Sequence, residues 1–186
     1  MRITKQALVR RWTVCTIAAA VVFGVLAWSE FRLKQLSGAS TSDLQGFNTA
    51  IEYHWAFLHW PSRYAMRAGF DWGLDYLLMP LYAAAFFYSG ILARETFAPR
   101  PGRLRRLLTL LSAVPIAGAV LDAVENWLEM DQMLSGASDE MARSAFTVSN
   151  AKWMAIYVGL ILLVGAVMAR FAEHRQKQAR KSGTDT

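Results

Sequence analysis

Acidic side chains gather at the end of one apolar stretch of the sequence. Residues 118–130, GAVLDAVENWLEM, carry the carboxyl groups of Asp122, Glu125 and Glu129 and the amide of Asn126. Steps of three and four residues place the three carboxyl groups on one face of a helix, with the amide beside them. Carboxylates that converge at low dielectric require cations, basic partners or protons. The chemistry of this stretch therefore depends on whether it lies in water or in a membrane.

A second group of polar side chains occurs earlier in the chain at a matching spacing. Asp71 and Asp75 are four residues apart, and Tyr82 lies seven residues further on, so all three share one face of a helix. If this helix runs antiparallel to the one that carries Asp122, then Asp75 and Asp122 lie at similar height. The spacing therefore indicates a polar site that draws carboxyl groups from two neighbouring helices.

The composition indicates a membrane protein. Hydrophobic residues make up 54% of the 186 residues and charged residues 18%, against about 25% charged residues in soluble domains. Several apolar runs approach about 20 residues, which is the length that crosses a bilayer as a helix. The single cysteine, Cys15, excludes an internal disulfide and a zinc site built from cysteines.

Four apolar segments predict transmembrane helices. They are rich in Leu, Ala, Val and Gly and lack the strict alternation of barrel strands. We therefore predict an all-α integral membrane protein with four transmembrane helices in an antiparallel bundle. The single membrane domain covers residues 13–169 between basic tails at 1–12 and 170–186, and its predicted spans are residues 13–28, 72–93, 107–128 and 148–169.

The distribution of basic residues predicts the orientation. Fourteen of the 20 Lys and Arg residues, but only three of the 14 acids, fall in the two tails and in the loop between the second and third spans. By the positive-inside rule, both termini are cytoplasmic and the acidic face is extracytoplasmic, which in a bacterium places the chain in the inner membrane. The basic segments then suit anionic lipid headgroups at the cytoplasmic face, and the net charge of +6 requires no nucleic-acid partner.

The outer segment, residues 29–71, is too long to be a plain loop. Within it, residues 47–60 (FNTAIEYHWAFLHW) carry apolar side chains at helical spacing together with Trp and Tyr. This pattern predicts an amphipathic helix at the membrane interface, ended by Pro61. We expect the segment either to cover the outer ends of the bundle or to lie free among the headgroups.

We predict one polar site between the outer ends of the second, third and fourth spans. Asp75, Asp122 and Glu125 are candidate catalytic acids or bases. They are also candidate ligands for a divalent cation, with His54 and His59 of the outer segment as further candidates. The two histidines are five residues apart and point to different sides of a helix, which weakens a joint role. The predicted ligand-binding residues are Asp71, Asp75, Tyr82, Asp122, Glu125, Asn126 and Asn150.

The two ends of the acidic stretch are expected to lie at different depths in the membrane. Glu129 is nearest the predicted outer boundary, and we expect it to lie in water without a partner. Asp122 lies one to two turns inside the boundary, where an unpaired charge costs a few kcal/mol. The nearest bases in the sequence that could neutralise the site are Arg63, Arg67 and Lys152.

Three functions remain open from the sequence. The first is an outward-facing acidic pocket that binds a cation or a lipid-like ligand, with catalysis at the outer leaflet as its sharper version. The second is a structural or assembly subunit, with a membrane partner or in a homo-oligomer, whose carboxylates form an internal polar network. The third is a small proton-coupled transporter, which acids at only one end of the bundle fit less well. No phosphate-binding loop, nucleophile elbow or dinucleotide fingerprint points to a soluble class of enzyme.

Overall fold

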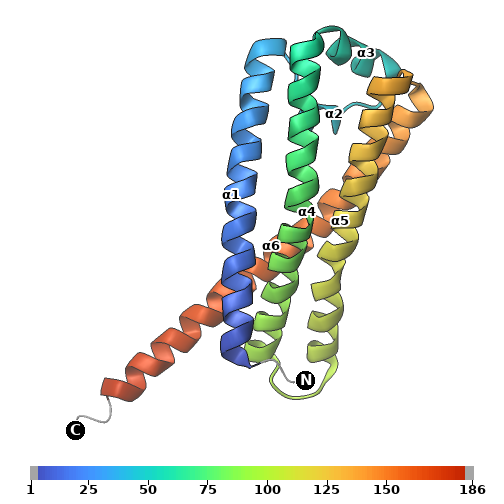
Figure 1. Cartoon of the computed structure of the whole chain (residues 1–186). Coiled ribbons are helices and arrows are strands. Elements are labelled where there is room, and N and C mark those ends of the chain that lie inside the picture. The colour runs from blue at the N-terminus through green and yellow to red at the C-terminus, as the bar shows by residue number, and fades with distance from the viewer. Residues whose placement is uncertain (1–3, 183–186) are drawn as a thin grey trace.

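The computed structural model describes residues 4–182, apart from the side chains of residues 176, 177 and 179–182 (Figure 1). It is 88% helical, and the described residues contain no strand. The predicted fold class is therefore confirmed. The helices are α1 (Lys5–Ser37), α2 (Thr41–Leu44), α3 (Ala50–Leu58), α4 (Ser62–Phe97), α5 (Arg103–Ser135) and α6 (Asp139–Ser182).

Four of the helices, α1, α4, α5 and α6, are long and apolar enough to cross a membrane. The shortest of them has 33 residues, which at about 1.5 Å per residue gives a length of about 50 Å. The hydrocarbon core of a bilayer is about 30 Å thick, so each helix extends beyond it. On α1, large side chains such as Val14, Val21 and Phe23 are exposed. Such a surface suits contact with lipid chains, and the chain is a small membrane protein.

Helix α4 is the centre of the bundle, because it packs against α1, α5 and α6. Helices α5 and α6 pack against each other, whereas the main neighbour of α1 is α4. In Figure 1, α1 starts and α6 ends at the end of the bundle opposite α3. Residues 98–102 join α4 to α5 at that same end, through a tight turn.

Local sequence explains where the helices begin and end. The hydroxyl of Thr4 caps the start of α1 by accepting a hydrogen bond from the backbone N–H of Ala7. Gly38 ends α1 with a φ of 85°, in the left-handed region that favours glycine. Gly136 ends α5 with a φ of 98°, and two residues later the hydroxyl of Ser138 accepts from the N–H of Met141 in the first turn of α6.

The segment between α1 and α4 folds back over the end of the bundle opposite residues 98–102, called the outer end below, with α3 lying across it (Figure 1). Helix α3 contacts α5 and α6, and its N–H at Ala50 donates to the Asp139 carboxylate of α6 at 2.8 Å. Its Tyr53 and the following Trp60 are buried with Trp72 of α4 in one apolar cluster. Of the two arrangements expected for this segment, the structure therefore shows the one that covers the bundle.

Glycines allow the long helices to approach closely. A Cβ on Gly90 of α4 would overlap the side chain of Ser112 on α5, and a Cβ on Gly159 of α6 would overlap the ring of Phe86 on α4. Gly118 of α5 lies in the same way against Ala155 of α6. Each pair of neighbours among α4, α5 and α6 therefore has one contact that only a glycine permits.

Substitution of Gly159 by Ala is expected to lower the free energy of unfolding by about 1–3 kcal/mol, because the added methyl group overlaps the Phe86 ring. Thermal unfolding of the purified protein in detergent micelles measures the effect. Gly165→Ala is a matched control on the same helix, because its added Cβ meets only the Ala93 methyl group at 3.6 Å. It should be neutral or stabilising, since Ala favours a helix over Gly by up to about 1 kcal/mol. Equal losses in the two variants would contradict this packing of α6 on α4.

Candidate functional site

A buried ion-pair cluster joins α5 to α6 near the outer end of the bundle. The Lys152 ammonium of α6 lies 2.9 Å from Asp122 Oδ1 and also pairs with Glu125 Oε2. The second Asp122 oxygen, Oδ2, accepts a hydrogen bond of 2.9 Å from the hydroxyl of Tyr82 on α4. The side chains of Lys152, Asp122 and Glu125 are at most 5% exposed. This arrangement ties three helices together through charged groups that are shielded from solvent.

A second contact joins α4 to α5 beside the ion pairs. The Asn126 amide donates to Asp75 Oδ2 at 2.8 Å, and Asn126 is 2% exposed. Asp75 itself is partly buried. The predicted grouping of Asp75, Tyr82, Asp122, Glu125 and Asn126 at one level between α4, α5 and α6 therefore occurs in the structure.

Glu129 is buried, so the expectation that it lies in water is wrong. Its side chain carries the polar stripe of α5 outward, and the residue is 1% exposed. The indole N–H of Trp72 on α4 donates to Glu129 Oε2 at 3.0 Å. The outer segment covers this end of the bundle and keeps the carboxyl group away from water.

Asp71 belongs to a different interface. It is buried, and the polar groups around it are Ser29 and Glu30 of α1 and Arg67 of the preceding turn of α4. Within the described part of the chain, neither of its carboxylate oxygens makes a hydrogen bond. The structure thus places Asp71 between α1 and α4, whereas Asp75 faces α5.

Three other predicted residues lie outside the cluster. Asn150 is exposed on α6, and its amide donates to the carbonyl of Phe146 in the preceding turn. His54 and His59 are exposed, and the Nδ1 of each lies 2.7 Å from the carbonyl of the residue four positions earlier. Across the described residues, no group of three or more His, Cys, Asp or Glu side chains is arranged to hold a metal ion.

Acids outnumber bases in the cluster. Asp122, Glu125 and Glu129 are buried and Asp75 is partly buried, whereas Lys152 is the one buried basic side chain among the described residues. The hydrogen bonds from Tyr82, Asn126 and Trp72 come from neutral donors and add no positive charge. If all four carboxyl groups were ionised, the cluster would therefore carry an excess of three negative charges.

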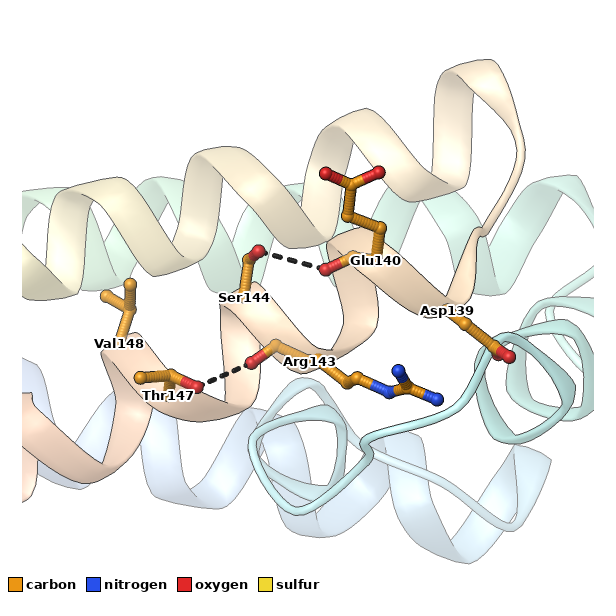
Figure 2. A pocket seen from close by; sticks show the side chains of 6 residues that line it. All are labelled: Asp139, Glu140, Arg143, Ser144, Thr147 and Val148. Atoms are coloured by element: carbon orange, nitrogen blue, oxygen red, sulfur yellow. Dashed lines mark hydrogen bonds between the residues drawn. The ribbon is translucent and has the colours of Figure 1, made fainter.

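An open surface hollow lies at the start of α6, apart from the cluster (Figure 2). The hydroxyls of Ser144 and Thr147 in its wall donate to the carbonyls of Glu140 and Arg143 of their own helix. These two polar groups are therefore already used within α6. The hollow contains none of the predicted site residues, and its lining is Asp139, Glu140, Arg143, Ser144, Thr147 and Val148.

Sequence reasoning named Lys152 as a candidate base for the site, and the structure shows that contact, but it did not assign Trp72 or Gln132 to the site. Lys152 lies inside an apolar run of the fourth span, and a lone base in such a run signals a buried acidic partner. The sequence position of Trp72 indicates a residue of the membrane boundary, although a buried indole N–H requires an acceptor. Gln132 continues the polar stripe of α5 three residues beyond Glu129, a spacing that identifies it once the stripe is known to be buried.

The chain matches no protein-family model, and no curated protein or solved structure is significantly similar to it. A function for the chain must therefore be inferred from its fold and from the geometry of the cluster.

Substitution of Lys152 by Met is expected to destabilise the protein by about 3–5 kcal/mol, because it leaves two buried carboxylates without their cation. Thermal unfolding in detergent micelles measures the loss. Adding Asp122→Asn and Glu125→Gln to this variant should restore part of the stability.

Lys34→Met is the matched control for this substitution. It removes an exposed ion pair with Asp43 in the outer segment, and such surface pairs contribute less than about 1 kcal/mol. If Lys152→Met were as mild as Lys34→Met, the ion pairs of Lys152 would not be what holds α5 to α6.

Proposed function

We propose that the chain is a protein of the bacterial inner membrane whose cluster between α4, α5 and α6 binds a small cation from the extracytoplasmic side. The observation that carries this proposal is the excess of buried carboxyl groups over buried bases. Lys152 neutralises one negative charge of the pair that it contacts, Asp122 and Glu125. Asp75 and Glu129 receive hydrogen bonds only from neutral donors in the described structure.

The low dielectric of the membrane makes buried charge costly. An ionised carboxyl group in this setting is costly unless a positive charge lies beside it. Neutral donors such as Asn126 and Trp72 stabilise a carboxylate without cancelling its charge. A bound cation offsets part of the excess and can leave every hydrogen bond of the cluster in place, while a carboxyl group without a cation can remain protonated. Oxygen ligands of this kind favour hard cations over soft ones.

The proposed orientation follows from the basic residues. Both termini and the turn at residues 98–102 would then be cytoplasmic, with the flanking arginines beside anionic lipid headgroups. Helix α3 and the outer ends of α4 and α5 would face the extracytoplasmic side. The cluster lies near that side, where the outer segment covers it.

A second candidate function is that of a structural or assembly subunit, and the ion pairs of Lys152 favour it. They connect α5 to α6 and, through Tyr82, to α4, as an internal network requires. In that case the cluster fixes how the helices pack and binds no ion. The two candidates differ in whether cations stabilise the folded protein.

The test compares unfolding temperatures of the purified full-length protein in detergent micelles. Na⁺, K⁺, Mg²⁺ and Ca²⁺ chlorides are each titrated against choline chloride at constant ionic strength and pH. A ligand that binds only the folded state at 100 times its dissociation constant stabilises it by about 2.7 kcal/mol. We therefore expect at least one of these ions to raise the unfolding temperature by several degrees, with saturation.

The double variant Asp75→Asn/Glu129→Gln should lose this response, because it removes the two carboxyl groups that Lys152 does not contact. Asp43→Asn is the matched control, since Asp43 is an acid of the outer segment already paired with Lys34. It should keep the full response. If none of the four ions stabilised the wild-type protein relative to choline, the cation-binding proposal would fail and the structural network would stand.

A further inference from the structure

We propose that Glu125, Glu129 and Gln132 of α5, with Tyr53 of α3 above them, form the ion site itself, and that it takes a small monovalent cation such as Na⁺. This inference rests on the proposed cation-binding function and adds the ligand atoms and the charge of the ion. Its experiment is chosen so that it can fail while cation binding to the cluster stands.

The three α5 side chains form the outer half of the buried polar stripe. They are four and three residues apart, so they lie on one face of the helix over two turns. Glu125, Glu129 and Gln132 are 0%, 1% and 0% exposed. Side chains of this polarity are rarely so buried unless a partner satisfies them.

Oxygen atoms along this stripe have unused bonding capacity. In residues 4–182, Glu129 Oε1 and both amide atoms of Gln132 make no hydrogen bond. Glu125 Oε1 has no partner in the same range, and the contact of Oε2 is the Lys152 ion pair. A buried polar atom without a partner costs about 1–3 kcal/mol. A cation coordinated by Glu125 Oε1, Glu129 Oε1 and Gln132 Oε1 would give all three oxygens a partner.

Tyr53 lies over this part of α5. Helix α3, which carries Tyr53, contacts α5, and Met130 and Met133 of α5 pack against the buried cluster that contains Tyr53. The Tyr53 hydroxyl donates a hydrogen bond to the carbonyl of Leu44 at 3.2 Å. A phenol oxygen that donates one hydrogen bond can still act as an acceptor, so it can serve as a neutral ligand.

The charges around the stripe favour a single positive charge. Glu125 shares the Lys152 ammonium with Asp122, whereas Glu129 has no positive partner among the described residues, so Glu129 is the side chain of the three that most needs a cation. Gln132 and Tyr53 contribute neutral oxygens. A divalent ion usually draws on more carboxylates, and the described residues hold no group of three or more acidic, His or Cys side chains arranged for a metal. A monovalent ion such as Na⁺ suits both this charge and oxygen ligands.

The experiment measures the apparent dissociation constant for Na⁺, from the Na⁺ dependence of the unfolding temperature at constant ionic strength with choline as the replacement cation. Glu129→Gln, an isosteric change, should abolish the Na⁺ response and leave the ion-free protein about as stable as wild type, because a neutral amide replaces a carboxyl group that is protonated when no ion is bound. Gln132→Leu should weaken Na⁺ binding at least tenfold. Asp75→Asn is measured in parallel, and Asp43→Asn, which changes an acid already paired with Lys34 in the outer segment, should retain the wild-type response.

The controls separate the ion site from the cluster as a whole. Gln45→Leu removes a glutamine of the outer segment that bonds only the Trp153 indole within the described structure, and it should leave the Na⁺ response unchanged. A response lost in Asp75→Asn and kept in Glu129→Gln and Gln132→Leu would overturn the site and leave the proposed function intact. A response to Mg²⁺ or Ca²⁺ without one to Na⁺ would overturn the charge assignment. If Gln132→Leu did not fold, Glu129→Gln alone would decide.

Discussion

The low dielectric around the outer third of the bundle is the constraint on which the rest of the structure depends. Three buried carboxyl groups lie on one face of α5, and Lys152 is the buried base that meets two of them. The Coulomb attraction between opposite charges is much stronger there than in water. Removing each charge from water also costs more free energy. Removing one partner therefore leaves the other charge in an unfavourable place, which ties the position of α6 to that of α5.

The other features of the fold keep this region dry and tightly packed. Gly118 lets α6 come close to α5 near Lys152, and Gly159 does the same between α6 and α4. At the outer end, α3 and its aromatic neighbours Tyr53 and Trp60 pack on Trp72 and cover the stripe. Helix α3 therefore shields from water a part of the stripe that lipid alone would leave exposed.

Much of this architecture could be predicted from the sequence because it depends on segment length and charge distribution. Apolar runs of bilayer length indicated the four helices, and the spacing of Asp122 and Glu125 indicated the face on which they lie. Which side chain of α6 faces α5 could not be predicted in this way. Asn150 and Lys152 are two residues apart, about 200° around a helix, so only one can face α5. The rotation of α6 is set by packing, and it selects Lys152.

Glu129 shows a second limit of sequence reasoning. The ends of the apolar runs predict how far Glu129 lies from the lipid boundary. They do not predict whether other parts of the protein cover it beyond that boundary. The covering segment, which includes Tyr53 some 76 positions earlier in the chain, is a tertiary contact that no local pattern reports. The orphaned oxygens of Glu129 and Gln132 arise from this cover, and they are the reason to expect an ion.

The cluster holds more carboxyl groups than Lys152 can neutralise, and the central claim is that a bound cation offsets part of the excess. Infrared spectroscopy of the purified protein, recorded in choline and again in Na⁺ at the same neutral pH, tests it most directly. The account predicts that Na⁺ converts a protonated carboxyl signal into a carboxylate signal, and that this change is absent in Glu129→Gln. Identical spectra in the two salts would contradict it, because the cluster would then be complete without an ion.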